Sequence, residues 1–305
     1  MDLLKQDKAL EEYKKEYDKN KMKLMDEIND IYGRFDYDTL RKYNTDLSRF
    51  KRETSEAIEQ DILTPYQLYM ARKWLNKRRI RNMDILLWYL IYKYARFNYF
   101  IKELEKTTFL KVNKMFVEET EKQCKKITGK DYKMDYKKLT DEALKEPNNL
   151  GYIWDTYKDS TVDFNANEIY NELVVGLKQD KKPIIEEVVN RQENRLIKIK
   201  KKEYGKSYSG ALENNIDYIT TYSQLQIFKK YGIERVKWIS VVDDRTCKEC
   251  ESLDGKEFNL NEWNEFVKYE NDDKEIETFK VDGIEIGVNA PPIHISCRCY
   301  LQPIR

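Results

Sequence analysis

The chain has 305 residues, a formal charge of +1, and 36% charged against 40% hydrophobic side chains. A mean hydropathy of −0.84 is low for a compact, many-layered enzyme and favours long, exposed helices. The 56 basic and 55 acidic residues nearly cancel, which excludes a chain-wide basic field for nucleic acid and leaves only local patches for such contacts.

The N-terminus is charged throughout and lacks the apolar run and cleavage site of a secretory signal. The most apolar stretch, residues 85–100, is interrupted by Lys93 and Arg96. Its uninterrupted part is shorter than the roughly 18–20 residues that span a bilayer. We therefore expect a buried helix here, and a soluble protein of intracellular origin that does not contact a membrane.

Helical periodicity begins at the N-terminus. Residues 1–32 carry Leu24, Ile28 and Ile31 at spacings of four and three, which predicts one apolar stripe on a helix ending near Gly33. Residues 37–60 are predicted to form a second, polar helix.

Thr64 and Pro65 give an N-cap followed by a proline at the first helical position. The segment 66–106 then reads as one long helix or as two, with a possible break at residues 82–84. Residues 108–127 continue the helical pattern and contain Cys124, which no other candidate ligand surrounds.

Residues 128–165 are rich in turn formers and predict a connecting region with short elements. Asn165 or Asn167 is a candidate N-cap for a helix reaching about Gly176. Pro183 is a candidate start for the next helix, whose predicted buried residues are Ile184, Ile185, Val188 and Val189.

The remaining third changes from helix to strand. Residues 207–231 are predicted to be helical, with a packed face formed by Tyr218, Tyr222, Leu225, Ile227 and Phe228. Alternation over 234–242 predicts a strand, residues 279–287 a hairpin around an Asp-Gly turn, and residues 299–304 a final strand.

We expect a mainly α fold with a small α+β C-terminal module. Its predicted regions are a helical region at 1–127, a connecting region with long helices at 128–231, and the C-terminal module at 232–305.

Two basic runs are candidates for nucleic-acid contact, and the first has Tyr69 and Trp74 as aromatic neighbours. The alternative interpretation is a solvated helix face that pairs with acidic neighbours, and it is favoured because charge runs are usually solvated. The candidate residues are Arg72, Lys73, Lys77, Arg78, Arg79, Arg81, Lys198, Lys200, Lys201 and Lys202.

The single histidine and four of the five cysteines lie in the C-terminal module. Cys247 and Cys250 form a C-x2-C pair, and His294 and Cys297 form an H-x2-C pair. Two such pairs can supply the four tetrahedral ligands of a structural Zn²⁺ site. We predict zinc on these four residues, with Cys299 as an alternative ligand. Bound iron, a disulfide in an oxidising compartment, and unligated buried thiols remain open alternatives.

The module resembles the phage head morphogenesis family, the minor head proteins similar to Mu protein F. The resemblance covers about residues 235–305. It rests on Trp238, Asp244-Arg245-Thr246-Cys247, Cys250, Asp254-Gly255, Pro291-Pro292, His294 and Cys297-Arg298-Cys299. Phe258 and Pro291 are separated by 32 residues, which is longer than the common family spacing and is read as an inserted helix plus hairpin.

The resemblance implies a minor head (minor capsid) protein of the virion, located in the head interior or at the portal vertex after assembly in the host cytoplasm. The implied partners are the portal protein and other capsid or scaffold proteins. The implied roles are head morphogenesis and genome packaging or delivery, including DNA ejection.

Two other functions are weighed against this one. The chain could be a non-specific DNA-binding protein delivered with the genome, using the basic runs. A metal-dependent nuclease with Asp243, Asp244 or Asp254 as acids is less favoured, because the only histidine is already assigned to the metal and a site filled by four protein ligands has no open position. We therefore expect no catalytic residue and no enzymatic activity.

Overall fold

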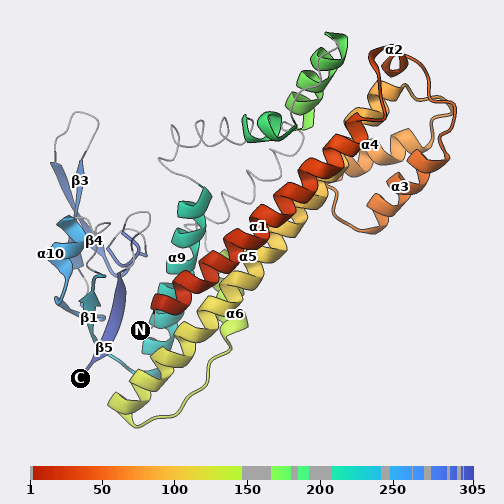
Figure 1. Ribbon diagram of the computed structural model, residues 1–305. Helices are drawn as coiled ribbons and strands as arrows, with labels where there is room; N and C mark the ends of the chain where they lie inside the picture. The colour runs from red at the N-terminus through yellow and green to blue at the C-terminus, as the bar shows by residue number, and fades with distance from the viewer. Residues whose placement is uncertain are drawn as a thin grey trace. The chain divides into compact units, whose positions relative to one another are not determined.

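The computed structural model describes residues 3–145, 166–179, 185–191, 208–241, 248–262, 264–270, 276–286, 289–293, 297 and 299–305. Most of these residues are helical, and a small antiparallel sheet lies in the C-terminal part of the chain (Figure 1). This confirms the mainly α fold with a small C-terminal sheet. None of the helices described combines the length and the apolar character that crossing a bilayer requires.

The described residues form two compact units. The helical unit draws on Glu12–Leu104 and Asp155–Gly205, and the sheet-bearing unit draws on Met1–Glu11, Glu105–Trp154 and Lys206–Arg305. These units follow spatial contacts rather than chain order, so the expected boundaries near residues 127 and 231 stay a prediction.

The helices of the first half begin and end close to the predicted positions. They are α1 (Leu3–Tyr32), α2 (Tyr37–Leu40), α3 (Ser48–Glu59), α4 (Pro65–Leu75) and α5 (Asn82–Thr128). Two predictions need correction. The polar segment 37–60 forms two helices rather than one, and the break within 66–106 lies at residues 76–81, just before the predicted position, so that Asn82 begins a helix.

The predicted start of α4 is confirmed in detail. The Thr64 hydroxyl accepts a hydrogen bond from the backbone of Gln67, and the Gln67 side chain accepts one from the backbone of Thr64. Pro65 then occupies the first helical position, where no backbone N–H is needed.

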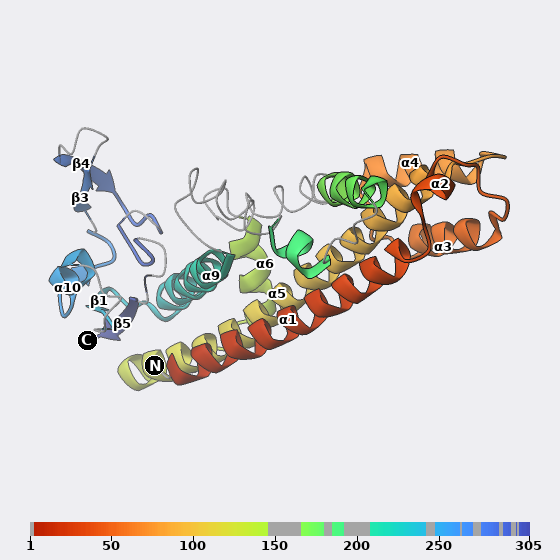
Figure 2. The same ribbon diagram turned by 45° about the horizontal axis from the view of Figure 1, so that its top comes forward.

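The apolar stretch 85–100 forms the centre of the core of the helical unit, as predicted. Trp88 is fully buried, with Trp74 edge-on at 5.4 Å and Tyr92 stacked at 6.4 Å between ring centroids. The two charges that interrupt the stretch are paired: Lys93 and Arg96 both reach Glu27 of α1. These ion pairs join the C-terminal half of α1 to α5, and the two helices run alongside each other in both views (Figures 1 and 2).

Two short helices complete this core. Residues 166–178 bury Ala166, Ile169 and Leu173, and residues 185–191 bury Ile185, Val188 and Val189. Both helices were expected. Their candidate starts at Asn165 and Pro183, together with Ile184, lie outside the described residues, whereas Asn167 lies inside the first helix.

The sheet-bearing unit is organised around β1 (Arg235–Ile239), which pairs antiparallel with β2 (Glu257–Asn259) on one side and β5 (Tyr300–Ile304) on the other. Its helices are α6 (Tyr136–Lys145), α9 (Tyr208–Tyr231) and α10 (Lys248–Leu253). Helix α9 and strands β1 and β5 were all predicted within a few residues.

The predicted hairpin is placed wrongly. It is formed by β3 (Asn264–Glu270) and β4 (Ile276–Asp282), and Asp282-Gly283 lies at the end of its second strand instead of forming its turn. The predicted inserted helix is also wrong, since the described residues between 259 and 290 contain these strands and no helix.

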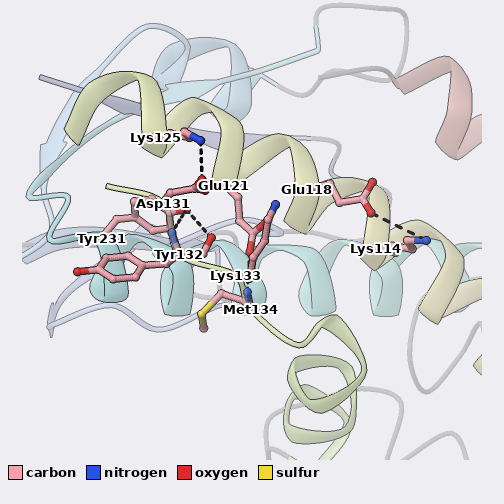
Figure 3. A network of polar contacts seen from close by, with 9 residues as sticks. All are labelled: Lys114, Glu118, Glu121, Lys125, Asp131, Tyr132, Lys133, Met134 and Tyr231. Atoms are coloured by element: carbon pink, nitrogen blue, oxygen red, sulfur yellow. Dashed lines mark hydrogen bonds and ion pairs between the residues drawn. The ribbon is translucent and has the colours of Figure 1, made fainter. Parts of the chain in front are cut away.

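A polar network fastens the end of α5 to the end of α9, immediately before β1 (Figure 3). The Tyr231 hydroxyl donates to the carbonyl of Tyr132 at 2.8 Å and accepts from its backbone N–H at 3.1 Å. The buried Glu121 carboxylate accepts from the Met134 backbone N–H at 2.6 Å and from the Lys133 ammonium at 3.1 Å, and this contact raises the pKa of Lys133.

Tyr231→Phe is therefore expected to destabilise the sheet-bearing unit. It leaves both backbone groups of Tyr132 without their partner, at a cost of roughly 1–3 kcal/mol in the free energy of unfolding. Urea denaturation followed by circular dichroism measures the change. Tyr66→Phe, at a tyrosine that is 62% exposed, is the control and should shift stability by less than about 0.5 kcal/mol. Equal effects of the two substitutions would contradict the role of the network.

Candidate metal centre

Three cysteine sulfurs converge in the sheet-bearing unit. Cys250 lies on α10, and Cys297 and Cys299 lie just before β5; their sulfur atoms are all within 4.8 Å of one another. All three side chains are buried. The Cys250 and Cys297 sulfurs are 3.7 Å apart, far longer than the roughly 2.05 Å of a disulfide.

The strand register explains how these residues meet. Trp238 is paired with Leu301 and Ile239 with Tyr300, and this register brings Ser240, just after β1, to Cys299, just before β5. The Ser240 hydroxyl donates to the Cys250 carbonyl at 2.6 Å and lies 3.4 Å from the Cys299 sulfur. A single hydroxyl thus links α10 to the segment before β5.

The turn between α10 and β2 is held by the same strand. The Ser240 backbone N–H donates to Asp254 Oδ1 at 2.8 Å, and the Gly255 N–H donates to the Trp238 carbonyl at 2.9 Å. Gly255 has φ of +78°, a left-handed conformation that glycine adopts without strain. Asp254 is therefore occupied in positioning the turn that follows Cys250.

The pKa values of the three thiols are shifted in different directions. Hydrogen bonds from Cys250 and Cys297 lower the pKa of the Cys299 thiol to about 3. Hydrogen bonding to Cys297 and burial raise the pKa of Cys250 far above its ordinary value. The indole N–H of Trp238 is buried and meets no acceptor at hydrogen-bond distance among the described residues, yet it helps to lower the pKa of the Cys299 thiol. Of the three thiols, only Cys299 has a lowered pKa, so the cluster favours a thiolate at that sulfur, the form in which cysteine binds metals.

The spacing of the sulfurs fits a tetrahedral thiolate site. With Zn–S bonds of about 2.3 Å, adjacent sulfurs of a tetrahedron lie roughly 3.8 Å apart, close to the 3.7 Å between Cys250 and Cys297. Three soft sulfur donors in a buried pocket also suit zinc or iron better than they suit Mg²⁺ or Ca²⁺.

The predicted site residues are brought together in part. Cys250 and Cys297 are in the cluster, Cys299 joins them on equal terms, and Cys247 and His294 lie outside the described residues. Cys124 is buried in α5 and is not in the cluster; burial raises the pKa of its thiol to about 12. Sequence reasoning missed Ser240, whose role depends on the β1–β5 register.

Some of the basic candidates also lie outside the described residues. Residues 198–202 lie outside the described part of the chain, whereas the candidates between Arg72 and Arg81 lie in the helical unit and are largely exposed.

If the cluster holds a metal as predicted, Ser240→Ala is expected to weaken its binding about 10- to 100-fold, as removal of outer hydrogen-bonding partners typically does. The Cys250 carbonyl and the Cys299 sulfur both lose their contact with the hydroxyl. Competition with a chromophoric chelator measures the affinity. Ser55→Ala on α3 is the control and should leave the affinity unchanged. Wild-type affinity in Ser240→Ala would show that the hydroxyl does not support the cluster.

The cysteine cluster lies in a part of the chain that matches a known protein family. Residues 189–302 match the family described as Phage Mu protein F like protein. The match confirms the resemblance seen in the sequence over about 235–305, and it extends further toward the N-terminus, so that it includes α9. No curated protein matches the chain, and no solved structure matches it. Residues 189–302 of this chain are therefore similar to the family described as Phage Mu protein F like protein.

Proposed function

We propose that the protein is a minor head protein that associates with the portal and with other capsid or scaffold proteins during head morphogenesis. The observation that carries the proposal is the Mu F-like match over residues 189–302, the region that contains the buried cysteine cluster. The role is structural: the chain holds partners together during assembly and genome packaging or delivery. It acts in the host cytoplasm and then in the virion, in the head interior or at the portal vertex.

The proposed cofactor is zinc, held by Cys250, Cys297 and Cys299 together with Cys247 or His294. When bound, the metal supplies a cross-link between α10 and the segment before β5. Such a link stabilises a small module whose sheet, in the described part of the chain, has three short strands. The Mu F-like region can then keep a fixed surface for a partner without a large core.

The proposal includes the absence of enzymatic activity. A site closed by four protein ligands has no position for a reacting water. Asp254, the described member of the three candidate acids, accepts a hydrogen bond from the Ser240 backbone and so serves the turn.

The direct test is co-expression with the portal protein encoded by the same phage. A tag on the portal should retain this chain, and the two should elute as one complex in size-exclusion chromatography with light scattering. Mass spectrometry of purified virions should detect the chain in the head fraction. Absence from virions together with no portal complex would overturn the proposal, and Mg²⁺- or Zn²⁺-dependent cleavage of plasmid DNA would overturn its non-enzymatic part.

A further inference from the structure

A second candidate site is a surface of the helical unit formed by residues outside 189–302, the range that matches the phage family. It combines the last turn of α4, the linker 76–81 and the loop after α2. The sequence showed the first two as one basic run, and the structure adds the third. We call this set the basic surface; its charged members are Arg41, Lys42, Arg72, Lys73, Lys77, Arg78, Arg79 and Arg81.

The two loops of the basic surface are fixed against each other. Tyr43 and Arg81 form an antiparallel β-bridge. The Asn44 N–H donates to the Ile80 carbonyl at 2.9 Å, and the Asn82 N–H donates to the Lys42 carbonyl at 3.0 Å. The side chains of Asn44 and Asn82 are also hydrogen-bonded at 2.7 Å. Residues about forty positions apart in the chain therefore present their charges together.

The charges of the basic surface are not neutralised by ion pairs. Lys77 is half-buried and the other seven are exposed, and none lies within ion-pair distance of a carboxylate in the described part of the chain. Basic residues elsewhere in this unit do pair, as Arg49 does with Glu53. The same rigid arrangement thus holds like charges together, which is unfavourable until an anion binds.

The nearby acids are engaged with their own turns. Asp36 accepts a hydrogen bond from the Thr39 backbone, and Asp46 accepts one from the Ser48 backbone. The hydrogen bond from the Thr39 backbone is the largest cause that lowers the pKa of Asp36, and the charge of Lys42 is a smaller one. The acids therefore reduce the positive field without pairing with the basic side chains.

Exposed tyrosines accompany the charges. Tyr43 and Tyr69 are 51% and 61% exposed. Lys73 lies 5.9 Å from the ring centroid of Tyr69, and Arg81 lies 5.8 Å from that of Tyr43. Alternating cations and accessible rings are the two components with which proteins hold single-stranded nucleic acid.

We propose that the basic surface binds nucleic acid through its phosphodiester backbone, with the tyrosines stacking on the bases of a single strand. Such a site has no sequence preference, and its affinity falls steeply with salt because each phosphate contact releases counterions. An acidic protein partner would use the charges but would not require exposed rings. The proposal is independent of the head-protein role, since it concerns residues outside the family match.

Fluorescence anisotropy on the full chain tests it, with a labelled oligothymidylate and a duplex of the same length. The wild-type chain should bind the single strand more tightly than the duplex. The double variant Arg78→Glu, Arg79→Glu should lose about tenfold or more in affinity for both and show a shallower salt dependence. Tyr43→Ala with Tyr69→Ala should weaken single-strand binding about tenfold and leave the salt slope unchanged.

The matched control is Lys137→Glu, Lys138→Glu, which makes the same charge change at exposed positions on α6. It should stay within about twofold of the wild type. Equal loss in the control, or wild-type binding by the arginine variant, would overturn the proposal. Displacement by polyglutamate as effective as displacement by unlabelled oligothymidylate would overturn it in favour of an acidic protein, and unchanged binding by the tyrosine variant would overturn the stacking component.

Discussion

Cys297→Ser is expected to abolish binding of the proposed zinc and to unfold β1, α10, β2 and β5 while the helical unit stays folded. Cys297 is 1% exposed and its sulfur lies 3.7 Å from that of Cys250, so its loss opens the centre of the cluster. A metal held at about a thousandfold above its Kd contributes roughly 4 kcal/mol to stability, and the variant loses this contribution.

Elemental analysis of zinc and iron under reducing conditions should give about one metal per wild-type chain and almost none in the variant. Hydrogen exchange should show lost protection at the β1 and β5 amides and retained protection around Trp88. Cys124→Ala is the control: it changes another buried cysteine, lies outside the cluster and should keep its metal. Full metal content and full stability in Cys297→Ser would make the ligand assignment wrong.

The same assay identifies the fourth ligand. Cys247→Ser and His294→Ala are each made in the full chain. The substitution that lowers metal content to the level of Cys297→Ser marks the residue that completes the tetrahedron, while retention of metal by both would restrict the protein ligands to the three described cysteines.

Trp88→Ala should produce the second large effect, a loss of about 3–5 kcal/mol in the stability of the helical unit. Trp88 is fully buried between Trp74 and Tyr92, and truncation leaves a cavity that neighbours on two helices cannot fill together. Urea unfolding followed by circular dichroism measures the loss. Met22→Ala, at a 66% exposed position on α1, is the control and should change stability by less than about 0.5 kcal/mol.

Trp88→Phe separates packing from polarity. The indole N–H of Trp88 is buried without a hydrogen-bond partner in the described structure, so removing it relieves a desolvation cost while much of the ring volume remains. The loss should therefore be clearly smaller than that of Trp88→Ala. Similar losses in Trp88→Phe and Trp88→Ala would show that an aromatic ring at this position is not the main contributor to the stability of the core.

The elements that could be predicted are those specified by nearby residues. The stripe of Leu24, Ile28 and Ile31, the Thr64-Pro65 start and the apolar stretch 85–100 each carry a local signal, and the structure confirms all three. The knuckle spacing likewise identified the cysteine-rich module, because two cysteines three positions apart can point at one ion without help from the rest of the fold.

The errors have a common cause in contacts between distant residues. The linker 76–81 contains no glycine or proline, and it leaves the helix because its backbone pairs with residues 42–44. Asp282-Gly283 is a strong hairpin signal, but the pairing of β3 with β4 places it at the end of the second strand. Local sequence signals are overridden in both cases by hydrogen bonds that only the folded chain can form.

Periodicity, capping residues and cysteine spacing were thus enough to establish a helical chain with a small cysteine-rich module at its C-terminal end, because these signals act within a few residues. The choice of Cys299 as a full member of the cluster, the linking role of Ser240 and the addition of Arg41 and Lys42 to the basic surface required the folded structure. Each depends on a strand register or a β-bridge between segments far apart in the chain, and those pairings are fixed by packing rather than by any local pattern.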